Sequence, residues 1–297
     1  MVQILDGKKL SEKIADRLKR EISKFPKAPT LAIIQVGEKR ESSSYIDRKK
    51  KFAEKIGAKV HHIILEEKIT TEKLAEAVEV LNSDKNIHGI IVQLPLPKKI
   101  DRFKVIETIS PLKDVDGLTS ANAGLLYESA FGGNDPKNVS ARMIPATAKG
   151  IISLLKESKI PLAGKKALVV GRSLLVGKPV ALLLLKENAT VTIAHSKTVD
   201  LPKLSKENDV VVVAVGKPKF FNKSFVKKGQ VIVDVGTNSL TGPKLLEEVS
   251  KTKLVGDVDF DQVSKVVSAI SPVPGGVGPM TVASLFENLV VAFKSQK

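Results

Sequence analysis

The 297-residue chain contains no cysteine and no tryptophan, and its aromatic residues are ten phenylalanines and two tyrosines. The lack of cysteine excludes disulfides, thiolate zinc sites, cysteine nucleophiles and iron–sulfur clusters. Among its four histidines there is no pair at metal-ligand spacing, because the adjacent His61 and His62 point to opposite faces of a predicted strand. We therefore expect a protein whose chemistry uses no metal site.

Long apolar stretches are also missing. No stretch approaches the ~20 apolar residues that a membrane-spanning helix needs, and residues 1–10 lack the apolar core of a signal peptide. The composition, 42% hydrophobic and 27% charged, is typical of a globular protein with a sizeable core. Together with the lack of cysteine, these features predict a soluble protein of the cytoplasm that does not bind a membrane.

Acidic residues are too few to balance the basic ones, since 48 Lys and Arg stand against 32 Asp and Glu, a net charge of +16. Such a balance suits nucleic acid, an anionic cofactor or substrate, or a solvated lysine-rich surface. The lysines are spread along the chain, and no recognisable nucleic-acid motif is present. We favour an anionic small molecule, with a basic nucleic-acid-binding protein on a Rossmann-like scaffold as the alternative.

Strand and helix patterns alternate along almost the whole chain, which predicts βαβ units and mostly parallel sheets. A less regular stretch at 98–148 separates two alternating blocks. The fold class is therefore α/β, with two α/β domains, a cleft between them, and a Rossmann-like parallel sheet in the second. Strands are expected at 30–37, 59–66, 88–94, 165–170, 190–195, 209–215, 230–235 and 254–258, and helices at 11–25, 42–56, 70–82, 178–188 and 281–293.

A glycine turn follows the first strand of the second block. Gly171-Arg172-Ser173 leads to Gly177 and then to a predicted helix, the context in which a helix N-terminus binds a pyrophosphate. Gly171 permits a tight turn, and Gly177 permits close packing or backbone approach. Ser173 occupies the place of the middle glycine in the usual G-x-G-x-x-G pattern, so an ordinary strand-to-helix turn remains the alternative.

The end of the next strand favours NADP over NAD. An NAD site usually places a carboxylate there to bind the ribose hydroxyls, whereas this chain has His195-Ser196-Lys197-Thr198. Arg172, Ser196 and Lys197 are suited to surround a 2′-phosphate, which a carboxylate would repel. Gly216 and Thr237 end two later strands, where the backbone can approach a ligand or simply form a turn.

Polar side chains in the first block are candidates for chemistry. Tyr45 and Lys49 lie four residues apart on one helix face, and a desolvated lysine can exchange protons near neutrality. Gln93 ends a buried strand, and Asp116 could accept paired donors from an amidine-like ring edge. The alternatives are a solvated basic face for Lys49, an amide in a loop for Gln93 and a turn-capping carboxylate for Asp116.

The order of these segments resembles the successive motifs of the bifunctional methylenetetrahydrofolate dehydrogenase/methenyltetrahydrofolate cyclohydrolase family. The resemblance covers essentially the whole chain, and its most specific parts are the Gln-Leu-Pro-Leu-Pro segment and the last motif. Tyr-x-x-x-Lys is also a short-chain dehydrogenase signature, but there the pair follows the dinucleotide turn, whereas here it precedes it. The matching segments are Tyr45-x-x-x-Lys49 and residues 92–97, 113–118, 171–173, 195–198 and 272–281.

The resemblance implies a fold, an activity and an assembly. It implies a folate-binding catalytic domain at 1–143 plus 275–297, completed by the last helix, and a Rossmann-like NADP-binding domain at 144–274. It implies oxidation of 5,10-methylenetetrahydrofolate with NADP⁺ and hydrolysis of the methenyl product to 10-formyltetrahydrofolate, usually by a homodimer. A dehydrogenase without the cyclohydrolase step is the alternative within the family, and the retained Tyr45, Lys49 and Gln93 argue against it.

The resemblance also implies roles for single residues. Lys49 would transfer protons in the cyclohydrolase step, with Gln93 bonded to it, Tyr45 against the aminobenzoyl ring and Asp116 on the pterin edge. The residues that would bind the cofactor are Gly171, Arg172, Ser173, Ser196 and Thr237. The local sequence pattern adds Gly177 and Gly216 to this set. Pro274, Gly275 and Gly276 would lie where pterin and nicotinamide meet.

Two departures from the family pattern stand out. The family commonly has Pro-Cys-Thr-Pro before the helix that enters the second domain, and here the segment is Pro145-Ala146-Thr147-Ala148. Because the implied mechanism needs no cysteine, we expect altered packing there and retained activity. Thr237 stands where the family often has an apolar residue, so the family pattern does not predict how Thr237 contacts the cofactor.

Overall fold

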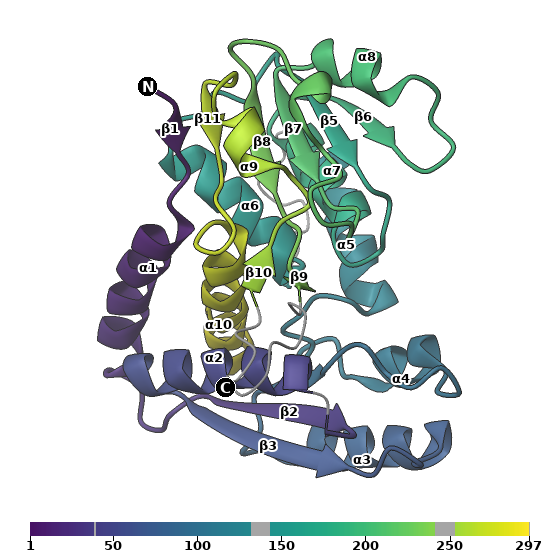
Figure 1. Cartoon of the computed structure of the whole chain (residues 1–297). Coiled ribbons are helices and arrows are strands. Elements are labelled where there is room, and N and C mark those ends of the chain that lie inside the picture. The colour runs from purple at the N-terminus through teal and green to yellow at the C-terminus, as the bar shows by residue number, and fades with distance from the viewer. Residues whose placement is uncertain (39, 132–142, 241–252, 297) are drawn as a thin grey trace, which may run out of the picture. The chain divides into compact units, whose positions relative to one another are not determined.

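The structure, a computed structural model, describes residues 1–38, 40–131, 143–240 and 253–296. The chain divides into two compact units (Figure 1). The first unit comprises Ser11–Ala146 and Val282–Lys297, and the second comprises Met1–Leu10 and Thr147–Thr281. Each unit has its own parallel sheet, so the expected α/β class is confirmed. No helix among the described residues is long and apolar enough to cross a membrane.

The second unit contains a parallel sheet with the strand order β1-β11-β8-β7-β5-β6. Valine and isoleucine fill its central strands, and all four residues of β7 are buried valines. Such continuous apolar runs are typical of parallel strands that are covered on both faces. The strands are β1 (Gln3–Ile4), β5 (Lys166–Val170), β6 (Thr190–Ala194), β7 (Val210–Val213), β8 (Val231–Asp234) and β11 (Ala269–Ile270).

The direction in which successive strands are added to this parallel sheet reverses once, after β6. From β5 the chain moves to β6 on one side, and then crosses to β7 on the other side of β5. In open α/β sheets, ligands bind outside the carboxyl ends of the strands at such a switch point. The residues that follow β5 and β7 therefore lie where a dinucleotide site is expected.

Helices and a hairpin complete the second unit. The expected helix at 178–188 is α7 (Gly177–Lys186), and the expected strand at 254–258 is the shorter β10 (Lys253–Val255). That strand pairs antiparallel with β9 (Asn238–Leu240) outside the main sheet. Phe221 and Phe225, with ring centroids 4.8 Å apart, belong to the core beside the sheet valines. The remaining elements are α6 (Ala146–Glu157), α8 (Leu201–Lys206), η1 (Lys223–Phe225) and α9 (Phe260–Val263).

The first unit contains a parallel sheet with the order β3-β2-β4. Its central strand β2 (Thr30–Val36) is buried from Leu31 onward and pairs with β3 (Lys59–Leu65) and β4 (Gly89–Val92). Ile34 and Ile90 pack with Leu74 and Val78 in one core. The helices are α1 (Gly7–Ile22, whose first residues belong to the second unit), α2 (Arg40–Ile56), α3 (Thr71–Ser83), α4 (Arg102–Thr108) and α5 (Ser120–Phe131).

The last helix, α10 (Val277–Ser295), supplies the first unit with aromatic core residues. The Phe286 ring stacks on Phe52 with centroids 5.3 Å apart, and Phe293 stacks on Phe25 at 4.7 Å. Phe286 and Phe293 are almost fully buried. The core of the first unit is therefore completed by residues from the end of the chain.

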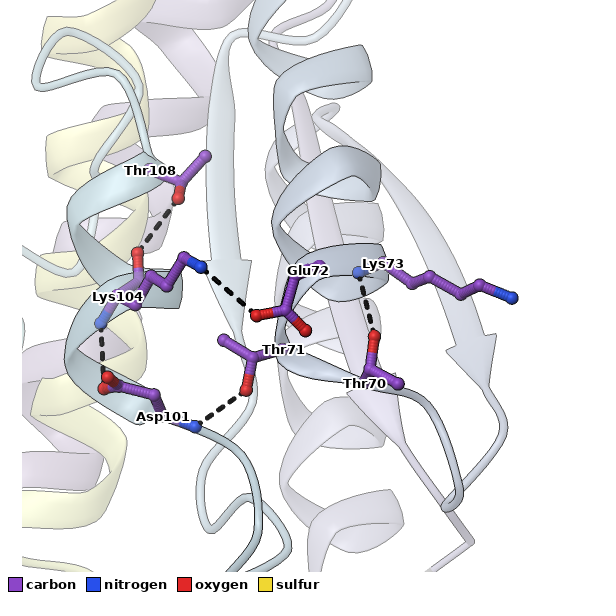
Figure 2. Close-up of polar contacts among 7 residues, drawn as sticks. All are labelled: Thr70, Thr71, Glu72, Lys73, Asp101, Lys104 and Thr108. Atoms are coloured by element: carbon purple, nitrogen blue, oxygen red, sulfur yellow. Dashed lines mark hydrogen bonds and ion pairs between the residues drawn. The ribbon is translucent and has the colours of Figure 1, made fainter.

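Side-chain caps define the starts of α3 and α4 (Figure 2). Thr70 Oγ1 accepts a hydrogen bond from the Lys73 amide at 3.3 Å, and Asp101 Oδ1 accepts one from the Lys104 amide at 3.1 Å. Each bond satisfies an amide that the helix itself leaves unpaired. Lys104 also pairs with Glu72 at 3.2 Å, an exposed ion pair that adds little to stability. The caps fix where α4 begins after the loop that follows β4.

Candidate functional site

Lys49 and Gln93 meet in the first unit. Lys49 lies on α2, and its Nζ donates to Gln93 Oε1 at 2.8 Å. The Gln93 amide nitrogen donates to the carbonyl oxygen of Leu94 at 2.9 Å, and the Gln93 backbone amide donates to Ile34 O at 2.8 Å. Gln93 is thus held by the end of the sheet, and its side-chain oxygen is directed toward the amine.

The environment of Lys49 favours its neutral form. Burial lowers the pKa of the Lys49 amine, and the nearby Asp116 carboxylate opposes this shift without cancelling it. A buried amine loses the hydration that stabilises an ammonium ion. Because a general base must be unprotonated to act, the lowered pKa makes Lys49 better suited than an exposed lysine to accept a proton.

Asp116 is the second titratable group in this arrangement, beside Lys49. Burial raises the pKa of its carboxyl group, Lys49 lowers it, and Asp114 raises it further. Lys49 and Asp116 thus interact electrostatically although they come from distant parts of the chain. The structure brings together three of the four catalytic candidates that the sequence proposed in the first block.

The loop that carries Asp116 is fixed by the buried Asp114. The Asp114 carboxylate accepts bonds from the amides of Leu118 and Thr119, the Thr119 hydroxyl and the Asn122 side chain, all between 2.8 and 3.1 Å. Gly117 has a φ of +69°, and a side chain there would lie 2.7 Å from the Pro145 nitrogen. The turn therefore requires glycine.

Lys113 anchors the other end of this loop. It is buried, and its ammonium donates to the carbonyl oxygens of Leu81, Asn82 and Asp84 at 2.7 to 3.0 Å. Three acceptors match the three donors of an ammonium group. Neither Lys113 nor Asp114 was assigned a role from the sequence, because their contacts with backbone carbonyls and with Thr119 and Asn122 arise only in the folded loop.

Tyr45 lies one turn before Lys49 on α2 and is half-buried. The guanidinium carbon of Arg48 lies 5.4 Å from the centroid of the Tyr45 ring, within the range of a cation–π contact. The spacing of four residues places Tyr45 and Lys49 on the same side of the helix, as the sequence predicts. A partly exposed ring beside the Lys49 group is suited to stack against a planar substrate.

The glycine turn after β5 has the form that the sequence predicts. Gly171 has a φ of +134°, and a side chain there would lie 2.3 Å from the Ala214 carbonyl oxygen. A side chain at Gly177 would lie 2.2 Å from the Gly171 carbonyl oxygen. Ser173 Oγ accepts from the amides of Val176 and Gly177 at 3.2 and 3.3 Å. This close-packed strand, turn and helix fits a pyrophosphate group.

Arg172 and Ser196 follow neighbouring strands. Val170 pairs with Ala194 at the ends of β5 and β6, and each candidate lies two residues beyond its strand. Both side chains are exposed and therefore accessible to a ligand. A cation and a hydroxyl at adjacent strand ends fit a 2′-phosphate.

The remaining cofactor candidates end β7 and β8. Gly216 has a φ of +66°, and its amide donates to the carboxylate of Asp257 at 2.8 Å. Thr237 is exposed after the buried Gly236. Asp257 was not predicted as a site residue, although a charged side chain near the end of the strand predicted at 254–258 was an available signal.

Pro274, Gly275 and Gly276 belong to the second unit, whereas Lys49, Gln93 and Asp116 belong to the first. The Gly276 amide donates to Pro272 O at 2.8 Å, and Gly275 O accepts from the Lys8 amide at 2.8 Å. Gly275 has a φ of +112°. These bonds form a tight backbone turn before α10, close to the first residues of α1.

Two family models match the chain. The catalytic domain of tetrahydrofolate dehydrogenase/cyclohydrolase matches residues 5–116, and the NAD(P)-binding domain of the same family matches residues 145–297. The two matches correspond to the two alternating blocks of the sequence. The NAD(P)-binding match contains the glycine turn and the strand ends described above.

Relatives and solved structures agree with these matches over the full length. The chain is 48% identical over 297 residues to bifunctional protein FolD of Listeria monocytogenes, covering 99% of this chain and 98% of that one. The bifunctional FolD of Campylobacter jejuni is 39% identical with a TM-score of 0.89, and each chain is covered completely. The Trypanosoma brucei FolD, solved with NADP and an inhibitor, is 35% identical with a TM-score of 0.91 over 99% of this chain and 98% of that one. The chain belongs to the tetrahydrofolate dehydrogenase/cyclohydrolase family.

Proposed function

We propose that the protein oxidises 5,10-methylenetetrahydrofolate to 5,10-methenyltetrahydrofolate with NADP⁺ and hydrolyses the product to 10-formyltetrahydrofolate. Family membership supports the pair of activities. The observation that carries the cyclohydrolase step is the Lys49 amine, which has a lowered pKa and lies 2.8 Å from the Gln93 side chain.

In the dehydrogenase step the protein mainly aligns the reactants. When bound, NADP⁺ supplies a nicotinamide ring that accepts the hydride from the methylene carbon. We assign the pyrophosphate to Gly171, Ser173 and Gly177, and the 2′-phosphate to Arg172 and Ser196. Gly216 and Thr237 contribute at the neighbouring strand ends, and Pro274 to Gly276 lie toward the reacting rings.

In the cyclohydrolase step Lys49 accepts a proton. Water adds to the cationic methenyl carbon and releases one proton, which the neutral Lys49 amine takes up. The bond from that carbon to N5 then breaks, the hydroxyl proton leaves, and N5 takes up a proton, which gives the 10-formyl product. Gln93 orients the amine, Asp116 accepts hydrogen bonds from the pterin edge, and Tyr45 packs on the aminobenzoyl ring.

A dehydrogenase without cyclohydrolase activity is the second candidate. It requires that Lys49 have no access to the methenyl group. The presence of Tyr45, Lys49, Gln93 and Asp116, three of them interacting in the first unit, favours the bifunctional enzyme. A nucleic-acid-binding protein has no support beyond the net charge of +16.

One spectrophotometric assay tests the proposal. Methylenetetrahydrofolate is supplied with NADP⁺ or NAD⁺, and both the reduced dinucleotide and the methenyl intermediate are followed. The wild type is expected to reduce NADP⁺ with little accumulation of the intermediate. Absence of reduction with either dinucleotide would reject the dehydrogenase.

A variant pair separates the two steps. Lys49→Met is expected to abolish hydrolysis and to let the methenyl compound accumulate, because the amine is gone while the dinucleotide site is intact. Lys51→Met is the matched control, because Lys51 is exposed on the same helix. Equal loss of both activities in folded Lys49→Met would contradict the role of Lys49.

The proposal includes a homodimer that works in the cytoplasm. The family resemblance supports the dimer, and the lack of cysteine agrees with a reducing compartment. Light scattering after size-exclusion chromatography tests the first point, and fractionation of the native cells tests the second.

A further inference from the structure

The buried carboxylate of Asp257 joins two strand ends of the second unit. Its Oδ2 accepts hydrogen bonds from the backbone amides of Val215 and Gly216 at 2.7 and 2.8 Å. Its Oδ1 accepts a bond from the Asn238 side-chain amide at 2.9 Å. Val215 and Gly216 follow β7, and Asn238, the first residue of β9, follows Thr237 after β8, so one side chain ties together two segments of the proposed dinucleotide site.

The backbone around Asp257 is held by a second buried carboxylate, that of Asp234 at the end of β8. Asp234 Oδ1 accepts from the amides of Gly236 and Asp257, each at 2.9 Å, and Oδ2 accepts from the Val258 amide at 3.0 Å. The two aspartates thus form a chain of hydrogen bonds from β8 through Asp257 to the end of β7. Six donors, five of them backbone amides, bind these four oxygens.

The packing around this pair leaves no space for side chains on the adjoining glycines. A side chain at Gly236 would lie 2.3 Å from the Asp257 nitrogen, and one at Gly256 would lie 1.8 Å from Asp234 Oδ2. Asp257 has no exposed surface. It therefore does not touch a ligand itself, and its negative charge is directed at protein donors.

We infer that Asp257 is a positioning residue for dinucleotide binding, which fixes the backbone of Val215 and Gly216 and, through Asn238, the segment after Thr237. The inference rests on the proposed function, because that function places the dinucleotide at these strand ends. Hydrogen bonds from amides to a carboxylate are stronger than those to a neutral acceptor. Without them, the Gly216 turn would have to be ordered at the moment of binding, which weakens affinity.

Two variants and a matched control test this role. Asp257→Ala removes all three bonds. Asp257→Asn keeps an oxygen for the two amides, and rotation of the Asn238 amide restores the third bond at the cost of the long 3.4 Å bond from Asn238 to Val255 O. Asp209→Ala is the control: Asp209 Oδ2 accepts a bond from the Lys166 amide at 3.0 Å, but at the beginning of β7 and β5, at the opposite edge of the same sheet.

The readouts are the Kd for NADPH, measured by its fluorescence, and the methenyl hydrolysis rate without dinucleotide. Asp257→Ala is expected to raise the Kd about tenfold or more, Asp257→Asn by less, and Asp209→Ala by less than about twofold. The hydrolysis rate should fall by a smaller factor than NADPH affinity in both Asp257 variants. This split separates positioning from general loss of stability.

Failure of this inference can be distinguished from failure of the proposed function. If the wild type binds NADPH and turns over the folate, but both Asp257 variants bind NADPH as the wild type does, the positioning role is rejected alone. Equal changes in Kd for Asp257→Ala and Asp209→Ala would also reject it. If Asp257→Ala does not fold, Asp257→Asn decides: an unchanged Kd rejects the role, and a raised Kd with the folded control unchanged supports it.

Discussion

Lys49 and Gln93 form a hydrogen bond of 2.8 Å between residues that lie 44 positions apart in the chain. The bond joins α2 to the end of β4, so that the amine is held by the sheet of the first unit. Asp116 acts on the same amine and raises its pKa, while burial lowers it more strongly. Substitutions at Gln93 or Asp116 are therefore expected to change the pKa of Lys49.

Gln93→Glu should move the pH profile of methenyl hydrolysis to higher pH by about one unit or more. A carboxylate at this position stabilises the ammonium form of Lys49, so a higher pH is needed to produce the neutral amine. Rates of hydrolysis between pH 6 and 10 provide the measurement. Gln93→Ala is the control, since it removes the acceptor without adding charge and should lower the rate without an alkaline shift. Superimposable profiles for Gln93→Glu and the wild type would contradict the role of the neutral amine.

Arg172→Ala should weaken NADP⁺ binding about 10-fold to 100-fold and leave NAD⁺ binding nearly unchanged. The reason is the loss of charge-assisted bonds to the 2′-phosphate, which NAD⁺ lacks. Titration calorimetry with both dinucleotides gives the two affinities. Lys186→Ala, which removes an exposed cation from the other end of α7, should change neither. A parallel loss of both affinities would place Arg172 away from the 2′-phosphate.

Gly177→Ala should destabilise the protein by about 1–3 kcal/mol and weaken NADP⁺ binding. The added carbon would lie 2.2 Å from the Gly171 carbonyl oxygen, so the turn and the start of α7 must separate. Thermal unfolding with and without NADP⁺ measures both effects. Gly124→Ala on α5, where an added carbon meets no atom within 4 Å, should be neutral or slightly stabilising. Wild-type stability in Gly177→Ala would show that the close contact does not constrain the turn.

Asp234 should make stability depend on pH. Burial raises the pKa of its carboxyl group from 3.8 to about 7; hydrogen bonds from three backbone amides lower this pKa, and the neighbouring Asp257 carboxylate raises it. Between these values the folded protein keeps a proton that the unfolded chain has released. The contribution of Asp234 to the free energy of unfolding is therefore fully present below about pH 4, falls as pH rises through about 7, and then levels off.

Urea unfolding at several pH values measures this dependence. In Asp234→Asn the group does not titrate, so the fall in stability between about pH 4 and 7 should be smaller than in the wild type. Asp209→Asn is the control, because it removes a partly exposed carboxylate from the same sheet. Identical slopes in the wild type and Asp234→Asn would show that Asp234 is ionised throughout this range.

The sequence predicted the elements whose pattern is local. The valine-rich strands and the glycine turn at Gly171 were found because apolar runs and glycines mark them directly. The strand Gln3–Ile4 was not predicted, since a two-residue strand has no periodicity of its own. It pairs with Ala269 and Ile270 of β11, more than 260 residues away in the sequence.

Fewer of the contacts in the candidate site could be predicted from the sequence. Lys49 stands among Arg48, Lys50 and Lys51 and has the pattern of a solvated face, so only the family motif singled it out. Its burial and its bond to Gln93 arise from the packing of α2 on the sheet. Asp257 was missed for a similar reason, because its partners are backbone amides 41 and 42 residues away.

The position of α10 in the chain has a consequence for synthesis on the ribosome. Phe25 and Phe52 can stack on Phe293 and Phe286 only after α10 has been translated. Most of the first unit, residues 11–146, precedes residues 147–281 in the chain, yet its core closes only after residues 147–281 have emerged. During that interval its aromatic surface is open, so a chaperone that binds nascent apolar segments is expected to select this half, and a stop codon before α10 should yield an aggregating fragment.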